Sequence, residues 1–376
     1  MAGIYVHIPF CKSRCSYCDF YSSTYQGNRE VLIQNICQEL VEQKNFFLNN
    51  EIIKTIYLGG GTPSLLNNKD LNQIFETIKN NFTLDLEEVT LEANPDDLSI
   101  KKISELKQFP INRLSIGVQS FFDKDLLFIN RRHTAQQAIH AIKRCQDNGF
   151  ENVSIDLIYG LPNQTLENWG ENIETAISLN VPHISAYHLT FEGGTKITRQ
   201  RDSGLFKEID EDLSFEMYRL LIKKLTKANI SQYEISNFAK YGFESKHNSS
   251  YWNETPYLGV GPAAHSFNGK TRRWNISNSR LYLQLRKEHK IFYETENIDT
   301  QTRYNDLIIT SLRTIKGLDF NKFIKTFDND IISYFEKEIS RFRTSGDIIF
   351  KEGFYALSEI GIFKSDYIIE KLLWVD

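Results

Sequence analysis

Short apolar runs alternate with amphipathic segments through the first half of the chain. The apolar runs predict six strands, at Gly3–Ile8, Lys54–Leu58, Glu88–Ala93, Arg113–Val118, Val153–Ile158 and His183–Leu189. Apolar residues at helical spacing predict helices between them, at Arg29–Phe47, Lys69–Phe82, Ile100–Phe109, Thr134–Asn148 and Leu166–Leu179. This alternation predicts a parallel sheet with right-handed crossovers. Six such units suit an open barrel or a doubly wound sheet and are too few for a closed eight-fold barrel.

The pattern changes after about residue 200. Asp210–Ala228 predicts a helix, Gln232–Phe238 a strand, and residues 245–275 a loop rich in His, Asn, Tyr, Trp and Gly.

From residue 297 the chain predicts two helices, a hairpin and a further helix. The hairpin covers Ile348–Leu357, with Glu352-Gly353 at its turn. We therefore expect two domains, residues 1–290 and a small helical, winged-helix-like domain at 297–376.

Polar and glycine-rich residues follow each predicted strand of the first half. They are the cysteine loop after the first strand, then Gly59–Pro63, Asn94–Asp96, Gln119–Ser120 and Tyr159–Pro162. Because ligand sites of parallel α/β folds gather at the carboxyl ends of the strands, we expect these residues to share one rim.

Composition and charge exclude several classes of protein. With 41% hydrophobic and 24% charged residues among 376, and a net charge of −4, the chain is typical of a globular protein without a nucleic-acid footprint. A strand is already expected at residue 3 and no apolar run of 18 residues occurs, so we expect neither a signal peptide nor a membrane span. Few cysteines in so long a chain indicate a reducing, cytoplasmic location, with any membrane contact peripheral.

Three of the five cysteines, Cys11, Cys15 and Cys18, stand in a C-x3-C-x2-C run. Three thiolates are one fewer than a cubane iron–sulfur cluster needs, which leaves one iron open for chemistry. Taken alone, the run could also be a zinc site. Phe20 occupies the position where a fourth cysteine would follow, and Cys37 and Cys145 are expected to be buried thiols.

The run Tyr5-Val6-His7-Ile8-Pro9-Phe10 before these cysteines, together with Gly-Gly-Gly-Thr-Pro after the second strand, resembles the radical S-adenosylmethionine (SAM) superfamily. More narrowly, the chain resembles the branch of oxygen-independent coproporphyrinogen oxidases and their relatives, over nearly its whole length. The resemblance implies an open partial (β/α)6, TIM-like barrel, a [4Fe–4S] cluster, SAM and an electron donor. It also implies reductive cleavage of SAM, although the sequence leaves open whether cleavage occurs here.

The resemblance also assigns residues. Cys11, Cys15 and Cys18 would hold the cluster, and the positions matched to SAM are Tyr5, Gly60, Gly61, Thr62, Glu92, Gln119, Arg131, Asp156, Ala186 and Ala264. Bare glycine backbone would approach the methionine part of SAM, and Glu92 would accept hydrogen bonds from the ribose. The alternatives are a tight strand-to-helix turn for the glycines and a surface ion pair for Arg131.

A second element, His247-Asn248-Ser249-Ser250-Tyr251-Trp252, resembles the heme-binding element of heme chaperones in the same superfamily. Imidazole is a common axial ligand of heme iron, and in a helix His247 and Tyr251 would share one face. The alternative is a polar-aromatic loop in which His247 is hydrogen-bonded to backbone. We expect His7 and His265 to be structural.

Two functions follow from the resemblance. One is a heme chaperone that delivers heme to membrane hemoproteins such as respiratory cytochromes, with a homodimer in its loaded form. The alternative is an oxygen-independent coproporphyrinogen III oxidase, whose pattern has a further cysteine at the position of Phe20 and a longer arm before the cluster than the ten residues here. Phe20, the short arm and the element at 247–252 favour the heme chaperone.

Overall fold

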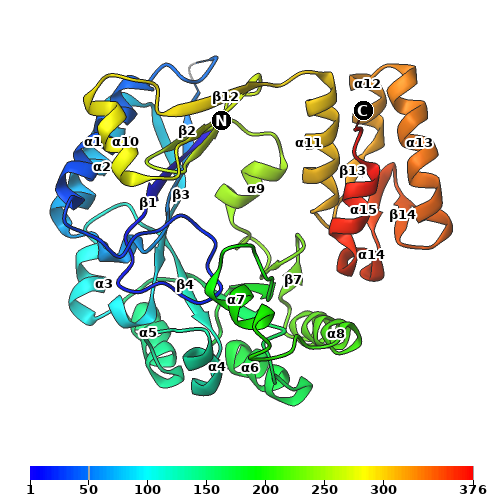
Figure 1. The fold of residues 1–376 in the computed structure, drawn as a ribbon, viewed down its shortest axis with the longest axis horizontal. Coiled ribbons are helices and arrows are strands. Elements are labelled where there is room, and N and C mark those ends of the chain that lie inside the picture. Colours follow the sequence, from blue (N-terminus) through cyan, green and yellow to red (C-terminus); the bar gives the residue numbers. More distant parts are fainter. Residues whose placement is uncertain (50, 376) are drawn as a thin grey trace.

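A curved sheet of twelve strands forms the centre of the computed structural model, which describes residues 1–49 and 51–375. The parallel strands are β1 (Ala2–Ile8), β2 (Ile53–Gly60), β3 (Leu84–Ala93), β4 (Arg113–Gln119), β5 (Asn152–Tyr159) and β6 (His183–His188). They lie side by side in chain order, and the sheet ends in two unpaired edges (Figure 1). The six predicted strands and the open barrel are therefore confirmed.

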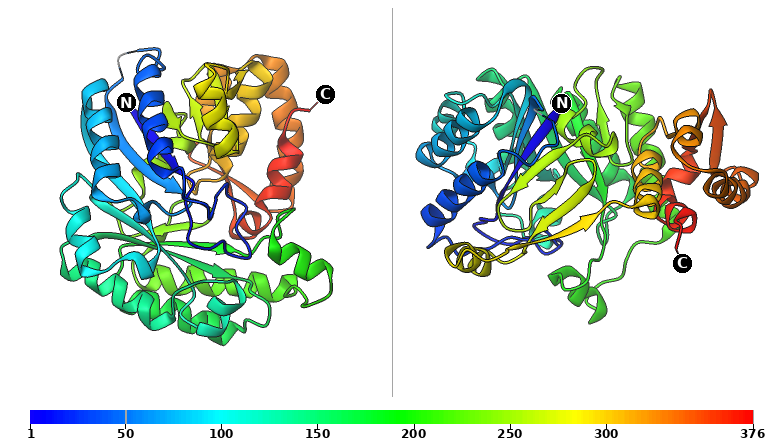
Figure 2. Two further views of the ribbon diagram at one scale, coloured as in Figure 1. Left: turned by 60° about the vertical axis from the view of Figure 1, so that its left-hand side comes forward. Right: turned by 90° about the horizontal axis from the view of Figure 1, so that it is seen from above.

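Helices cover the outer face of the parallel strands (Figure 2). They are α1 (Arg29–Glu42), α2 (Asn68–Asn81), α3 (Ile100–Leu106), α5 (Ala135–Asp147), α6 (Leu166–Ser178) and α8 (Glu211–Lys227). Helix α1 ends at Glu42 rather than Phe47, because Phe46 and Phe47 leave the helix to pack against the core. The short helices α4 (Asp123–Phe128) and α7 (Lys196–Asp202) were not predicted.

The positions that face the interior of the barrel are polar or aromatic. A parallel barrel filled with branched apolar side chains is a packed core. Here alternate residues of neighbouring strands, including Tyr57, Glu92, Ser115 and Asp156, line a cavity instead. The inside of this barrel is therefore a site.

Residues 245–275 are not a loop, so that prediction was wrong. They form α9 (Lys246–Trp252) and extend the sheet beyond β1 by β9 (Tyr257–Val260), β10 (His265–Phe267) and β11 (Thr271–Asn275), followed by α10 (Ser279–Lys287) and β12 (Tyr293–Asn297). The strands are only 3–5 residues long and carry Arg, Asn and Trp, so no apolar periodicity marks them.

At the other edge, the single predicted strand Gln232–Phe238 is two strands. The chain reverses between β7 (Ser231–Gln232) and β8 (Asn237–Ala239), which pair antiparallel. A turn at Glu234 separates the two strands, and the Glu234 carboxylate accepts a hydrogen bond from the side-chain amide of Asn237.

The C-terminal part packs beside the barrel, to the right in Figure 1. Its elements are α11 (Thr300–Leu312), β13 (Leu318–Asp319), α12 (Phe320–Thr326), α13 (Asn329–Thr344), β14 (Ile348–Lys351), β15 (Phe354–Leu357), α14 (Glu359–Phe363) and α15 (Ser365–Leu372). The predicted hairpin is confirmed, and β13 joins it to make a three-stranded sheet. Its turn requires left-handed backbone at Glu352 and Gly353, with φ of 54° and 86°.

Among residues 1–49 and 51–375, no helix has both the length and the apolarity to cross a membrane.

Candidate functional site

The three clustered cysteines lie on the loop after β1. The loop is pinned at its base, since the backbone N–H of Cys11 donates to the carbonyl of Ser23 at 2.9 Å and that of Ser23 donates to Pro9 at 2.6 Å. Cys11 is buried, while Cys15 and Cys18 are half-buried. Burial, and next the proximity of Cys15, raises the pKa of the Cys18 thiol to about 11.

The chemistry of this donor set suits a cluster. Within residues 1–49 and 51–375, no three His, Cys, Asp or Glu side chains are gathered so as to hold a single metal ion. Three thiols on one loop are the donor type that a cubane iron–sulfur cluster uses, one thiolate to each iron.

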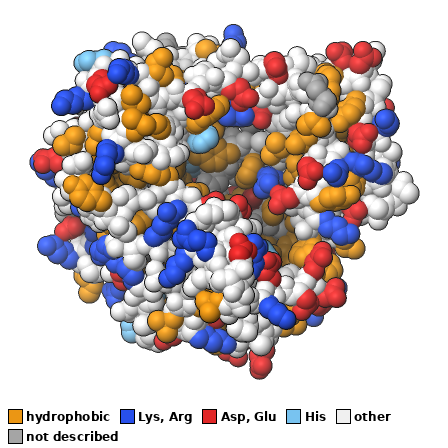
Figure 3. All heavy atoms as spheres, viewed as in Figure 1, with side chains coloured by type: hydrophobic (Ala, Val, Ile, Leu, Met, Phe, Trp, Pro, Cys, Tyr) orange, Lys and Arg blue, Asp and Glu red, His pale blue; other side chains and the backbone are white. Residues whose placement is uncertain are grey.

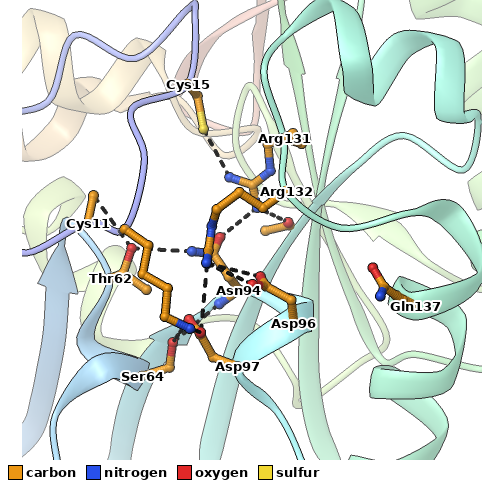
Figure 4. Close-up of polar contacts among 12 residues, drawn as sticks. Cys11, Cys15, Thr62, Ser64, Asn94, Asp96, Asp97, Arg131, Arg132 and Gln137 are labelled. Atoms are coloured by element: carbon orange, nitrogen blue, oxygen red, sulfur yellow. Dashed lines mark hydrogen bonds and ion pairs between the residues drawn. The ribbon is translucent and has the colours of Figure 1, made fainter. Parts of the chain in front are cut away.

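Polar contacts tie the cysteine loop to the neighbouring strand ends (Figure 4). Oγ1 of Thr62, after β2, donates to Sγ of Cys11 at 3.5 Å, and Nη1 of Arg131 donates to Sγ of Cys15 at 3.2 Å. The other end of the Arg131 guanidinium donates to Oδ1 of Asn94 at 2.6 Å and to the carbonyl of Gly117. Arg131 therefore joins the loop to β3 and β4 and is not a surface ion pair.

An outer layer of charges supports this contact. Nζ of Lys12 lies 2.5 Å from Oδ1 of Asp97, and Nη2 of Arg132 lies 2.9 Å from Oδ2 of Asp96. Oγ of Ser64 donates to Oδ2 of Asp97 at 3.0 Å. The turns after β2 and β3 thus hold the cysteine loop from two sides.

A cavity of about 840 Å³ opens beside this rim, within the usual range for ligand sites. The surface is hollowed between the barrel and the C-terminal part (Figure 3). The sequence-predicted residues on its wall are Tyr5, Cys18, Gly60, Gly61, Thr62, Glu92, Gln119, Arg131 and Asp156. Each of the five predicted strand-end segments contributes to this cavity, so the expectation that they share one rim is confirmed.

Two carboxyl groups on the wall have raised pKa values. Burial, and next the negative charge of Asp156, raises the pKa of Glu92 to about 7, although Glu92 accepts hydrogen bonds from the Tyr57 hydroxyl at 2.8 Å and the Gly60 N–H at 3.0 Å. Burial raises the pKa of Asp156 to about 6. Both side chains therefore change charge near neutral pH, so a bound ligand or cation will set their protonation.

Gly60 and Gly61 are required by the chain's own packing as well as by the cavity. Gly60 has φ of 107°, and a Cβ there would lie 2.5 Å from the ring of His7. A Cβ on Gly61 would lie 2.8 Å from the carbonyl oxygen of Ile8. The tight turn and the approach to a ligand are thus compatible, because the same bare backbone serves both.

Gln119 reaches the cavity through an irregularity in β4. The register between β4 and β5 shifts between Gly117 and Gln119, and Gln119 has left-handed backbone with φ of 72°. Such bulges re-aim side chains next to sites. A Cβ on Gly117 would lie 2.9 Å from Nε2 of Gln119, so the glycine leaves room for that amide.

His247 lies outside the cavity wall, on α9. Its Nδ1 lies 2.8 Å from Oγ1 of Thr55 and its Nε2 lies 3.0 Å from the Tyr251 hydroxyl, which confirms the predicted shared face. Burial lowers the pKa of His247 to about 3. Both ring nitrogens are thus engaged with side chains rather than backbone, and binding to heme iron requires one of these contacts to break.

Helix α9 itself is held by a buried carboxylate that the sequence did not single out. Glu88 accepts from the N–H of Lys246 at 2.8 Å and of His247 at 3.0 Å, where helix N–H groups lack partners. The ring of Tyr57 stacks on His247 at 5.1 Å. The helix therefore closes the amino end of the barrel.

The remaining predicted residues lie behind the wall. Ala186 is buried in β6 between the cavity residues Ser185 and Tyr187, and Ala264 is buried in the turn between β9 and β10. His7 binds Tyr5 and the carbonyl of Tyr21 internally, as expected for a structural histidine.

Part of the cavity wall escaped sequence reasoning altogether. Arg113 lines the cavity from the start of β4. The C-terminal part contributes Arg313, Ile362, Phe363, Ser365 and Asp366. No sequence motif marks these positions, since only the fold brings them to the barrel.

This barrel and its cysteine rim define a radical SAM protein. The sequence model of the radical SAM superfamily matches residues 5–176. The fold is similar to that of coproporphyrinogen III oxidase (HemN) from Escherichia coli over 99% of this chain and 90% of that one, with a TM-score of 0.85 and 21% identity. At that identity the likeness shows the fold alone.

Closer sequence similarity is found with heme chaperones named HemW. The chain is 36% identical to HemW from Bacillus subtilis over 338 residues, which cover 89% of each chain. It is 35% identical to HemW from Escherichia coli over 266 residues, 70% of this chain and 69% of that one. The chain therefore belongs to the HemW family. Membership in the radical SAM superfamily implies a [4Fe–4S] cluster and SAM as cofactors.

Proposed function

We propose that this protein is a heme chaperone that binds heme, a [4Fe–4S] cluster and SAM, and delivers heme to membrane hemoproteins such as respiratory cytochromes. The observation that carries the proposal is the 36% identity with the heme chaperone HemW of Bacillus subtilis along 89% of both chains. The cavity, with aromatic and titratable groups on its wall, offers room for a flat cargo.

In this proposal Cys11, Cys15 and Cys18 would hold a [4Fe–4S] cluster and would leave one iron open for SAM. The cluster, when bound, supplies single electrons. Arg131 orients Cys15 and Thr62 orients Cys11 through the contacts described above.

The proposed SAM site continues along the wall. Glu92 accepts hydrogen bonds from the ribose, and Gly60 and Gly61 receive the methionine part. Gln119 and Asp156 line the same cavity from β4 and β5, and Tyr5 lines it from β1. Ala186 and Ala264 support the site from behind the wall, in β6 and in the turn before β10.

Heme transfer is the direct test. The protein is reconstituted anaerobically with iron and sulfide, titrated with ferric heme and mixed with an apo-cytochrome. We expect saturable heme binding and the appearance of holo-cytochrome. In this proposal the protein is cytoplasmic and meets its heme acceptors at the membrane surface. Absence of either binding or transfer would contradict the proposal, and size-exclusion chromatography of the loaded form tests for the dimer.

The second candidate is a coproporphyrinogen III oxidase, the alternative that the cysteine run and the Gly-Gly-Gly-Thr-Pro motif leave open. Phe20, which is 66% exposed on the cavity wall, offers no ligand where the oxidase pattern has its further cysteine. Anaerobic incubation of the reconstituted protein with coproporphyrinogen III and SAM distinguishes the two. Robust formation of protoporphyrinogen IX would establish the oxidase.

A further inference from the structure

Arg113 is a buried arginine on the cavity wall that forms no ion pair with a carboxylate of the described residues. It is 1% exposed and points into the barrel from the first position of β4. Its Nε has no hydrogen-bond partner in the described part of the chain. Burying a cation without a partner costs several kcal/mol, so the position calls for an explanation.

Two carboxyl groups on the same wall, those of Glu92 and Asp156, are engaged elsewhere. Glu92 accepts from Tyr57 and Gly60, and Asp156 accepts from Ser115 at 3.5 Å. Arg113 lowers the pKa of both carboxyl groups through space, but burial outweighs it and both values stay raised. Among the described residues neither carboxyl group accepts a hydrogen bond from Arg113, so its Nε is left without an acceptor.

The histidines around Arg113 add no acceptor. Nδ1 of His183 lies 2.7 Å from Oγ of Ser154, and its Nε2 lies 2.8 Å from the Tyr233 hydroxyl. Burial, and next the charge of Arg113, lowers the pKa of His183 well below its usual value. Both ring nitrogens of His183 are thus engaged, so the unpartnered Nε of Arg113 is open to an acceptor that a ligand supplies.

The methionine part of SAM is placed nearer the rim than Arg113. Gly60, which receives it in the proposed site, lies level with Ile116, three positions along β4 from Arg113 or about 10 Å of strand. The cysteine loop that would anchor SAM lies at the rim end. The anion at Arg113 therefore belongs to a second ligand, one that reaches deep into the barrel.

We infer that Arg113 binds a carboxylate of the ligand carried in the cavity. A guanidinium fork matches a carboxylate with two parallel hydrogen bonds. This inference rests on the proposed function, under which the carboxylate is a heme propionate. Arg113 would then select the cargo by its charge, while the aromatic wall accommodates the ring.

Comparison of ferric heme with its dimethyl ester tests the inference on the unmodified chain. Charge-assisted hydrogen bonds of this kind correspond to about 10- to 100-fold in affinity, so we expect ferric heme to bind that much more tightly than the ester. Equal affinity for the two would overturn the inference and leave the chaperone proposal intact. Failure to bind either one would contradict the chaperone proposal itself.

Two variants test whether the preference for ferric heme over its dimethyl ester depends on Arg113. Arg113→Gln should bind both compounds alike, near the affinity of the ester, and Arg113→Lys should retain part of the preference. Arg273→Gln is the matched control, because Arg273 is also buried with an unpartnered Nε among the described residues but lies on β11 outside the cavity. It should keep the full preference.

The variants also separate a structural role. If Arg113→Gln weakens both compounds equally, Arg113 supports the fold and the inference is wrong. If it abolishes SAM binding while the preference for ferric heme persists, the anion is SAM and the inference is likewise wrong. Circular dichroism melts monitor folding, and should Arg113→Gln not fold, the Lys variant and the ester comparison decide.

Discussion

Nη1 of Arg131 lies 3.2 Å from Sγ of Cys15, and the same guanidinium binds Asn94 and the carbonyl of Gly117. One planar cation thus connects the loop that would hold a cluster to the ends of two strands.

We expect Arg131→Lys to lower the free energy of unfolding by about 1–3 kcal/mol, because a single ammonium cannot span these partners. Iron content after reconstitution should fall as well. Urea denaturation and iron analysis measure the two effects. Arg132→Lys is the control, since its half-exposed ion pair with Asp96 should contribute at most about 1 kcal/mol. Equal losses in both variants would contradict the bridging role.

Glu92→Gln should stabilise the apo-protein at neutral pH while weakening SAM binding. The folded-state pKa of Glu92 is about 7, above its unfolded value, so the folded state binds the extra proton and stability falls as pH rises from about 4.5 to 7. The glutamine amide does not titrate, so this loss of about 1–3 kcal/mol in the free energy of unfolding disappears. The charged acceptor proposed for SAM is lost with it. Thermal melts across this pH range, with the exposed Glu87→Gln as control, measure the effect.

His133→Gln should make the protein less sensitive to acid. Burial, and next the charge of Arg131, lowers the pKa of His133 to about 4, so wild-type stability is lost as pH falls from about 6.5 to 4. Glutamine keeps a donor for the carbonyl of Val118, which lies 3.0 Å from Nε2 of His133. We expect a gain of about 1–3 kcal/mol relative to wild type at pH 4. The exposed His140→Gln should show none in the same urea titrations.

His247→Ala should weaken heme binding and leave the absorbance of the cluster intact, if His247 is the axial ligand. Tyr251→Phe removes the hydroxyl that occupies Nε2 and frees that nitrogen, so under the same hypothesis it should speed heme uptake. Stopped-flow absorbance follows both. Unchanged heme affinity in His247→Ala removes the residue from the ligand set.

Phe20→Ala should weaken heme binding with little effect on stability. The ring is 66% exposed and its loss should change the free energy of unfolding by less than about 0.5 kcal/mol, while the cavity loses an aromatic face. Tyr241→Ala, at 99% exposure and away from the cavity, is the control. Heme titrations of both variants test this prediction, and an equal heme affinity in the two would contradict it.

The rim could be predicted from the sequence for a physical reason. Parallel strands joined by right-handed crossovers bring their carboxyl ends to one edge, so Cys18, Gly60, Glu92 and Gln119 had to meet wherever the strands began. The same local logic gave the contact of His247 with Tyr251, because helical spacing alone sets it.

The burial of Arg113 inside the barrel and the strands β9–β11 could not be predicted from the sequence. Arg113 is the first residue of a strand, where a charged residue usually reaches solvent, yet it is buried by residues far from it in the sequence. Strands β9–β11 are too short and polar to leave a periodic pattern. Long-range packing decides both, and no window of sequence contains it.

One wall of the cavity belongs to α14 and the start of α15. Helix α14 meets α8 through the rings of Phe215 and Phe363, 5.0 Å apart, and through Arg219 and Glu359 at 3.3 Å. The width of the cavity therefore depends on this contact between α8 and α14 as well as on the barrel strands. Two barrels lined by the same residues would admit ligands of different thickness if the contact between α8 and α14 differed.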